Sequence, residues 1–309
     1  MKAHNFFAKI FDKILNIVGY KYYLFIPKNT IFTNNPPPHI INNLKANLNT
    51  PDIKLINSIL LLNTIDKKII KLKDLSIYSK FYKLSIFTKI YLKIKYKLPK
   101  NVKLLDEVFK HHNGLKFLSS TILKSLANKS CITAGASWGD SPLIFSKYCS
   151  QVYAFEPSDE FYTMLVNVIA KNSLTDKISP YKKALFNANT DVFLRNDIQY
   201  NLGHYLEFSK NPYNQSISTT TIDRFIQNNN ITNLGLLHLD IEGAEYNAIE
   251  GAIDTIKKFK PILLISIYHN EKDFFTIKPL IESLNLGYKF KIKKLSRIRL
   301  EVMLICYFD

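Results

Sequence analysis

Beyond about residue 110, short apolar runs alternate with segments of helical periodicity. The apolar runs predict five strands: "SCITA" (130–134), "QVYAFEP" (151–157), "ISPYKKALF" (178–186), "LGLLHL" (234–239) and "PILLISIYH" (261–269). Two further strand segments, "YKFKIKKL" and "RLEVMLICYF", end the chain and predict a β-hairpin. This order predicts an α/β fold, a doubly wound, mostly parallel, Rossmann-like sheet with an antiparallel C-terminal hairpin.

The N-terminal third has a different pattern. Residues 6–18 place their apolar side chains on one helical face, and residues 40–98 are mostly helical by periodicity, with Lys interleaved among Ile, Leu, Phe and Tyr. Three consecutive prolines at 36–38 interrupt the two segments. We therefore expect a basic, mostly helical region over 1–105 and an α/β domain over 106–309.

Charge separates the same two parts. Residues 1–100 hold 18 Lys and 4 acids, a charge of +14, whereas residues 101–309 hold 24 Lys plus Arg and 21 acids, a charge of +3. Two interpretations of the basic region stay open: a helical cap whose Lys side chains are solvated, or a surface that lies on anionic lipid. Nucleic acid is disfavoured, because the first 100 residues contain no Arg.

The chain lacks the features of a spanning or secreted protein. No uninterrupted apolar run approaches 18 residues, and the N-terminus carries charge throughout, unlike a signal peptide. The three cysteines, Cys131, Cys149 and Cys306, have no metal-ligand spacing and are too few for a disulfide framework. They predict reduced core residues and a cytoplasmic protein, with peripheral contact at the inner face of the membrane as an option.

Two of the nine glycines, Gly135 and Gly139, lie in "ITAGASWGDS", between a predicted strand and a predicted helix. Glycine has no Cβ, so the backbone of such a turn approaches a ligand closely, and the first N–H groups of the following helix are free to bind it. Ligands of doubly wound sheets bind at the carboxyl ends of the strands. The turn therefore predicts a ligand site, with a purely structural tight turn as the alternative.

Glu156 ends the next strand, 21 residues after Gly135. An acid at this distance is placed to bind both hydroxyls of an adenosine ribose, and we expect its side chain at the surface. The dinucleotide pattern Gly-x-Gly-x-x-Gly is absent, and Asp140 at the helix start would repel a pyrophosphate. S-adenosylmethionine, which carries a positive sulfonium, tolerates this acid, and the closing hairpin also favours it.

Residues 107–308 resemble the FkbM-type S-adenosylmethionine-dependent methyltransferases. "TAGASWGDS" is similar to the family's D-x-G-A-N-x-G-D turn and "VYAFEPS" to its ribose segment, while "STTTIDRF" and "LLHLDIEGAEYNAIEGA" resemble its T-x-D-x-F and K-x-D-x-E-G-x-E stretches. "ISIYHNEKDFFTI" and "LEVMLICY" are like the tail of one branch. The resemblance implies a class I methyltransferase fold with S-adenosyl-L-methionine as cofactor, held by Gly135, Ala136, Ser137, Gly139, Asp140, Glu156, Pro157 and Glu242.

The sequence departs from the family pattern at three positions. Thr133 stands where Asp is usual, Ser137 where Asn is usual and His238 where Lys is usual. The first departure bears on how the amino group of the cofactor's methionine end is held, a role for which Asp140 is close enough in sequence to substitute. His238 lies inside a strand and is expected to be a packed side chain.

Methylation of a hydroxyl requires in-line approach of the oxygen and an acceptor for its proton. In this fold the tip of the fourth strand lies beside the methyl group. We expect Asp240 and Glu242 to point to opposite sides, Asp240 toward the substrate, as base or hydroxyl acceptor, and Glu242 toward the cofactor. His269, at the end of the fifth strand, is the second predicted catalytic residue. Glu245 is interpreted as a charge at a helix N-terminus.

The expected function is O-methyl transfer to a sugar or other polyhydroxyl group of a bacterial surface-glycan intermediate. No metal is expected, because the acids and histidine lack a firm ligand spacing. The acceptor class follows from the resemblance and the basic N-terminal region. The N-P-P-aromatic motif of methyltransferases that modify amino groups of nucleic acid is missing from the strand tip. The alternative is a non-catalytic protein of the same fold, bound to membrane or a partner through its N-terminal helices.

Overall fold

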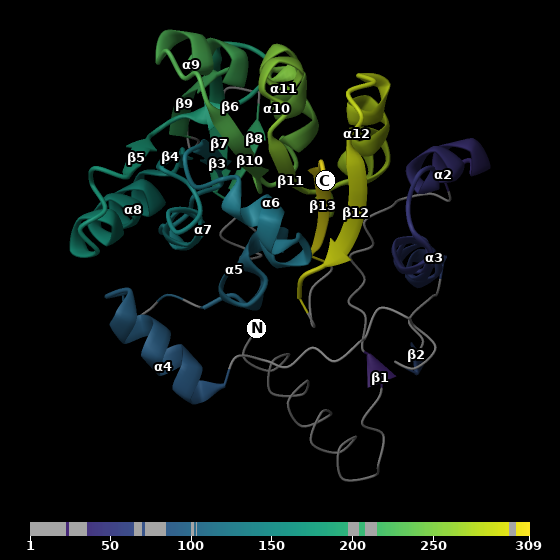
Figure 1. Ribbon diagram of the computed structural model, residues 1–309, viewed down its shortest axis with the longest axis horizontal. Helices are drawn as coiled ribbons and strands as arrows, with labels where there is room; N and C mark the ends of the chain where they lie inside the picture. Colours follow the sequence, from purple (N-terminus) through teal and green to yellow (C-terminus); the bar gives the residue numbers. More distant parts are fainter. Residues whose placement is uncertain are drawn as a thin grey trace.

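A seven-stranded, mostly parallel sheet forms the centre of the protein (Figure 1). The computed structural model describes residues 23–24, 36–64, 70–71, 85–99, 102, 104–196, 204–207, 215–296 and 301–309. The strand order is β12–β13–β11–β10–β3–β4–β5. The strands are β3 (Ser130–Ala134), β4 (Gln151–Phe155), β5 (Ile178–Tyr181), β10 (Leu234–Leu239), β11 (Ile262–Ser266), β12 (Lys289–Lys294) and β13 (Val302–Tyr307).

Only β13 runs against its neighbours in this sheet. It pairs antiparallel with both β11 and β12, whereas β5, β4, β3, β10 and β11 pair parallel. The order reverses at β3, which has β4 on one side and β10 on the other, so a crevice for ligands is expected where their carboxyl ends diverge. The predicted fold class, including the C-terminal hairpin, is confirmed.

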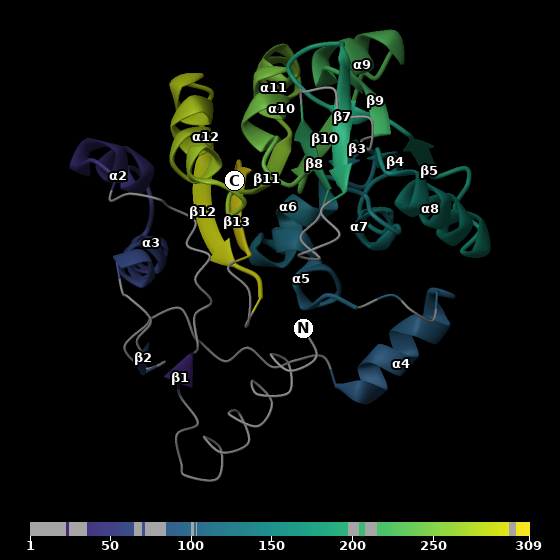
Figure 2. The same cartoon turned by 180° about the vertical axis from the view of Figure 1, so that it is seen from behind.

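Helices cover both faces of the sheet (Figures 1 and 2). Side chains alternate between two hydrophobic clusters: in β3, Cys131 packs into one cluster and Ile132 into the other. One face carries η2 (His112–Phe117), α6 (Ser120–Lys124), α7 (Asp140–Phe145) and α8 (Asp159–Lys171), preceded by α5 (Asp106–Phe109). The other carries α9 (Ile222–Asn228), α10 (Glu245–Glu250), α11 (Ile253–Phe259) and α12 (Glu271–Ser283).

A second sheet separates β5 from α9, and the hydrophobic pattern does not predict it. Its order is β6–β9–β7–β8, with β6 (Ala184–Leu185), β7 (Asp191–Asn196), β8 (His204–Glu207) and β9 (Gln215–Thr220). The expected third strand therefore divides between two sheets. The Ser/Thr run of "STTTIDRF" ends β9 and then caps α9, because the hydroxyl of Thr221 accepts the N–H of Arg224 at 3.1 Å.

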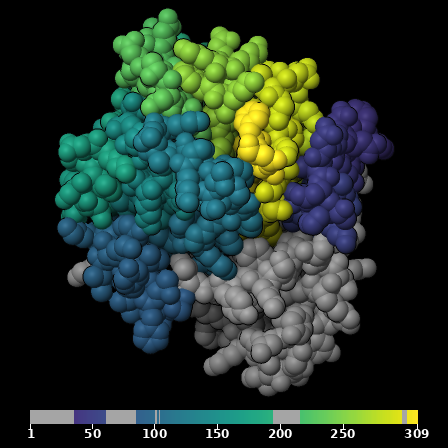
Figure 3. All heavy atoms as spheres, viewed as in Figure 1, coloured from purple at the N-terminus to yellow at the C-terminus, as the bar shows by residue number. Residues whose placement is uncertain are grey.

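Two helices of the basic region pack against the α/β domain. α2 (Pro38–Lys45) lies beside α12, and α3 (Thr50–Thr64) lies beside the edge strand β12, where Asp52 and Lys293 form an ion pair (Figures 1 and 3). Leu44, Ile56 and Ile59 are buried in the main hydrophobic cluster. These helices therefore cover an edge that would otherwise offer unpaired backbone groups.

The rest of the basic region is described in part. The structure describes α4 (Ile86–Lys95) and a short antiparallel pair, β1 (Tyr23–Leu24) with β2 (Ile70–Lys71). The amphipathic helix predicted over residues 6–18 lies outside the described residues. Within the described part of the chain, no helix is long and apolar enough to cross a membrane. The proposed boundary near residue 105 stays a prediction.

Candidate functional site

The glycine turn packs directly against the tip of β10. Gly135 has φ +77°, and a Cβ at this position would lie 1.8 Å from the carbonyl oxygen of Asp240. Gly139 has φ +107°, and a Cβ there would meet Leu165 at 3.2 Å. The backbone of Asp240 thus excludes any side chain at Gly135, and the positive φ favours glycine at both positions, which is the structural role given above as the alternative to a ligand site. The contact fixes the turn beside the acidic strand tip.

Glu156 holds the glycine turn together, in addition to any role with a ligand. Its two carboxylate oxygens accept the backbone N–H groups of Ser137, at 2.8 Å, and Ser158, at 2.9 Å. The residue is 5% exposed, so the expectation of a surface side chain was wrong. Burial raises the pKa of Glu156 to about 7. Ser137 has φ +47°, a left-handed conformation that suits the Asn usual in the family better than Ser.

Asp140 opens α7 as a buried acid. Its Oδ1 accepts the N–H of Ser141 at 2.9 Å, and burial raises its pKa to about 7. Among the residues that the structure describes, no Lys or Arg forms an ion pair with this carboxyl. A ligand with a positive charge would supply the missing partner. Ala136 is a buried core side chain, and Pro157 is half-buried.

Two of the departures from the family pattern contact each other. Thr133 and His238 are register partners on β3 and β10, and Thr133 Oγ1 lies 2.9 Å from His238 Nδ1. Both side chains are buried, as expected for His238, and burial lowers the pKa of His238 to about 4, which keeps the ring neutral. An uncharged pair thus occupies positions where the family usually has an acid and a base.

His269 lies at the centre of the acidic tip. Its Nδ1 is 2.8 Å from Glu245 Oε1, and its Nε2 is 3.5 Å from both Asp240 Oδ1 and Glu242 Oε2. Burial by itself lowers the pKa of His269, but the surrounding carboxylates outweigh it and raise the pKa to about 10. The imidazole is therefore a cation at neutral pH, able to donate protons to carboxylates and unable to accept another. Its catalytic role stays a prediction.

Glu245 shapes the loop that carries the other two acids. Its side chain is buried, and its oxygens accept the N–H groups of Ile241 at 2.7 Å and of Gly243 at 2.8 Å. Burial raises the pKa of Glu245, but His269 and these amide bonds hold it below its ordinary value. The residue does begin α10, but these contacts give it a larger role than a simple helix charge.

Asp240 and Glu242 face the same side, since each lies 3.5 Å from His269 Nε2, and the expectation that they point to opposite sides was wrong. Residues two apart share a face in a strand, and here β10 ends at Leu239 and Glu242 adopts φ +56°, so the turn after the strand sets their directions. Asp240 also accepts a hydrogen bond from the hydroxyl of Tyr268 at 3.3 Å, while its side chain remains 39% exposed. Glu242 is exposed to a similar extent, 35%, so the contact with Tyr268 is what distinguishes Asp240. Contact between Glu242 and the cofactor stays a prediction.

The structure adds acids that the sequence did not single out. Glu107, in α5, is half-buried, and this burial together with Glu301 and Asp240 raises its pKa to about 9. Glu301 immediately precedes β13. Glu301 could have been singled out in the sequence, because it is an acid inside the apolar run "RLEVMLICYF". The sequence around Glu107 has no comparable feature. Both carboxyl groups extend the acidic surroundings of Asp240.

Three side chains at the acidic tip lie close enough together to be considered as metal ligands. Asp240, Glu245 and His269 offer ligand atoms within 4.8 Å of one another. However, Glu245 already binds two backbone amides and His269 Nδ1, and His269 is protonated, so these atoms have other partners. The expected absence of a metal stays a prediction.

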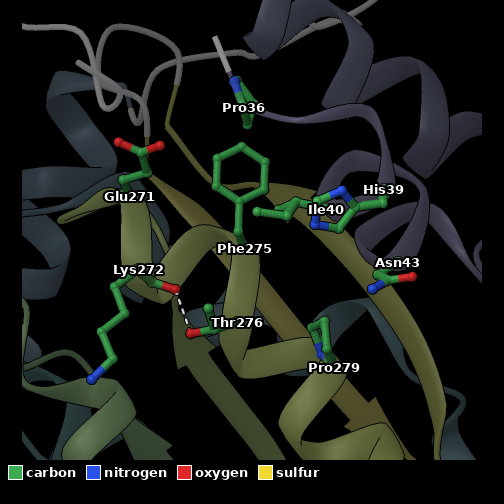
Figure 4. A pocket seen from close by; sticks show the side chains of 9 residues that line it. All are labelled: Pro36, His39, Ile40, Asn43, Glu271, Lys272, Phe275, Thr276 and Pro279. Carbon is green, nitrogen blue, oxygen red and sulfur yellow. Dashed lines mark hydrogen bonds between the residues drawn. The ribbon is translucent and has the colours of Figure 1, made fainter. Parts of the chain in front are cut away.

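A separate hollow lies between α2 and α12 (Figure 4). Lys272 turns away from it, and its ammonium lies 3.8 Å from the ring centroid of Tyr246. The hollow contains none of the residues expected to bind cofactor or to act in catalysis. It is lined by Pro36, His39, Ile40, Asn43, Glu271, Lys272, Phe275, Thr276 and Pro279.

Comparison with known proteins places the chain in a family. The Methyltransferase FkbM domain matches residues 127–290. A methyltransferase FkbM from Methylobacillus flagellatus KT is similar in structure, with a TM-score of 0.53 and 16% identity; the alignment covers 87% of this chain and 58% of that one, less than two thirds of its length.

More distant structures align less well. A putative methyltransferase from Streptococcus mutans in complex with SAH has a TM-score of 0.38 and 11% identity, over 60% of this chain and 92% of that one. An O-methyltransferase from Bacillus cereus in complex with SAH has a TM-score of 0.39 and 9% identity, over 71% and 88%. No curated protein matches the chain. Because the domain match spans more than half of the 309 residues, the chain belongs to the FkbM methyltransferase domain family.

Proposed function

We propose that the protein transfers the methyl group of S-adenosyl-L-methionine to a hydroxyl oxygen of a sugar, in an intermediate of a bacterial surface glycan. The observation that carries the proposal is the half-exposed carboxylate of Asp240, held between the hydroxyl of Tyr268 and the cationic His269. Carboxylates accept hydrogen bonds from hydroxyl groups, and the same groups repel the phosphates of nucleic acid. An oxygen acceptor is therefore favoured over a nucleic-acid base.

The residues at the glycine turn fit S-adenosylmethionine, the cofactor of this family. Asp140 is a buried carboxyl in need of a positive partner, which the ammonium of the methionine end supplies. Glu156 keeps acceptor capacity for ribose hydroxyls beyond its two backbone contacts, because each carboxylate oxygen has two lone pairs. When bound, the cofactor contributes an electrophilic methyl group on a sulfonium.

Asp240 is the proposed proton acceptor. It receives the hydrogen of the acceptor hydroxyl as the oxygen becomes bonded to the methyl carbon. His269 stays protonated through the reaction and holds the carboxylates of Asp240 and Glu242 in place, while Glu245 fixes the orientation of its ring. A deprotonated His269 is not needed at any step.

Thr133, in place of the usual Asp, is the main argument for the non-catalytic alternative, and its contacts weaken that argument. The hydroxyl of Thr133 contacts His238 inside the sheet, and both side chains are buried. Asp140, by contrast, keeps the acid that the family pattern has at this position. Calorimetric titration with S-adenosylmethionine separates the two functions, because the absence of heat would favour the non-catalytic one.

We place the reaction in the cytoplasm. The three cysteines are free and buried, as expected of a chain that folds in a reducing compartment.

The affinity for S-adenosylmethionine is expected to fall as the pH drops below 7. The pKa of Asp140 and that of Glu156 are each raised to about 7, so both acids are increasingly protonated below that pH, whereas the cofactor requires their charged forms. Protonation of each group lowers the affinity by up to about tenfold per pH unit. Calorimetry between pH 6 and pH 8 measures the slope, and Asp140→Asn should make it shallower. A flat profile in the native protein would contradict the assignment.

The acceptor class is tested with the full chain and cofactor carrying a deuterated methyl group. We expect label in the glycan fraction of cell extracts, recovered after hydrolysis as a methylated monosaccharide, and none with Asp240→Asn. Cells lacking the chain should lose one methyl group from a glycan. Label that appears only on nucleic acid or protein would overturn the proposed acceptor.

A further inference from the structure

α4 (Ile86–Lys95) presents an apolar face to solvent. Five large side chains on this helix are between 53% and 80% exposed, and no residue of the helix is buried. With 3.6 residues per turn, their spacing places them on one side of the helix. They are Ile86, Phe87, Ile90, Tyr91 and Ile94.

The carboxyl end of α4 is anchored to the α/β domain. Tyr96 and Leu98 are buried in a cluster with Trp138, a residue of the glycine turn, and Asn172 Nδ2 donates to the carbonyl of Tyr96 at 2.7 Å. Phe109 lies between the two rings, stacked on Trp138 and tilted against Tyr96. The helix as a whole lies below α8 and α5 in the view of Figures 1 and 3. The exposed face is therefore held in a fixed place relative to the cofactor turn.

Positive charge surrounds this face. Lys89 and Lys93 lie along one flank of the apolar stripe, and Lys95 lies along the other. Residues 75–105 contain eight Lys and neither Asp nor Glu. Long lysine side chains at the edge of an apolar stripe place their ammonium groups at the level of lipid headgroups while their methylene stems cover apolar surface.

We propose that α4 is a membrane-docking helix that lies in the headgroup region of an anionic bilayer, with its apolar face inserted. A helix of ten residues is about 15 Å long, too short to cross a bilayer. Charge complementarity selects anionic lipid over neutral lipid. Docking would place the glycine turn next to the membrane, through the Trp138 anchor. The proposal concerns location and does not depend on the methyl-transfer reaction.

The test is co-sedimentation of the full chain with vesicles. We expect binding to vesicles containing phosphatidylglycerol, little binding to pure phosphatidylcholine, and weaker binding at several hundred millimolar salt. Phe87→Ser combined with Ile90→Ser should reduce binding about tenfold or more, because it removes two inserted side chains. Lys89→Glu with Lys95→Glu should do the same.

Matched controls come from α8. Val166→Ser removes an exposed apolar side chain and Lys171→Glu reverses an exposed charge, and both should leave vesicle binding unchanged. Trp138 is the only tryptophan, so Phe87→Trp adds a second whose fluorescence brominated lipids should quench.

Three outcomes would overturn the proposal. The first is anionic-vesicle binding that the α4 variants do not change. The second is equal binding to neutral vesicles. The third is the absence of binding to anionic vesicles; a change of oligomeric state or a lowered melting temperature in Phe87→Ser would then assign the face to a second copy or to another segment of this chain.

Discussion

Replacing Glu156 by glutamine is expected to weaken the binding of S-adenosylmethionine about ten- to a hundredfold, since a charged acceptor contributes roughly 1.5–3 kcal/mol to a hydrogen bond. The carboxylate joins the tips of β3 and β4 by accepting the N–H groups of Ser137 and Ser158, and it is the acid proposed for the ribose hydroxyls. Glutamine keeps the size of the side chain and loses the charge. Calorimetric titration above pH 8, where Glu156 is mostly ionised, measures the effect.

The thermal stability of the same variant must be measured alongside its affinity. The glutamine amide has only one acceptor oxygen for two backbone N–H groups, so we expect a lower melting temperature as well, by a loss of about 1–2 kcal/mol. Glu156→Ala removes both bonds and should destabilise the fold further, because the residue is buried. Asp159→Asn is the matched control, an exposed acid at the start of α8. Native affinity in Glu156→Gln would place the ribose acid elsewhere.

The main sheet was predictable because its central strands are mostly apolar. β3, β10 and β11 are buried on both faces, and a strand in such a position reads as a continuous apolar run. β12 lies at an edge and alternates, which is the second pattern that a single sequence displays well. The succession of strands along the chain, and with it the fold class, followed from these runs and the helices between them.

The second sheet was not predictable on the same grounds. β9 is made of Gln, Ser, Ile and Thr, and its pairing partners β6 and β7 come from segments about 30 residues earlier in the chain. Polar β-branched residues fit either a capped turn or a strand, and only the tertiary partner decides between them. Thr221, one residue after β9 ends, caps α9.

At the site, the functional residues were easier to predict than the orientations of their side chains. The acids of the β10 tip were identified from the resemblance, but the prediction that Asp240 and Glu242 point to opposite sides was wrong, because both approach His269 Nε2 from the turn that follows Leu239. The contact between Thr133 and His238 joins residues 105 positions apart and has no local signal. The high pKa of His269 likewise depends on three carboxylates brought together by the fold.

Asp240→Asn is expected to lower kcat by about 10²–10⁴, the contribution of a positioned general base. Asparagine keeps the shape of the side chain and accepts the hydrogen bond from Tyr268, but it does not take up the proton of the acceptor hydroxyl. The change leaves the glycine turn intact, because Gly135 packs against the backbone oxygen of Asp240 and not against its side chain. Affinity for the cofactor should therefore stay within about threefold, since no proposed cofactor contact is removed.

Two further variants separate proton transfer from electrostatic positioning. Glu242→Gln removes the second carboxylate beside His269 Nε2 and should reduce kcat less than Asp240→Asn, because Glu242 is not the proposed proton acceptor. Asp254→Asn, on an exposed turn of α11, controls for loss of a negative charge elsewhere. Single-turnover rates with saturating cofactor isolate the transfer step from product release. If Asp240→Asn kept its rate while Glu242→Gln lost it, the two acids would exchange roles, and His269 would be holding Glu242 as the base.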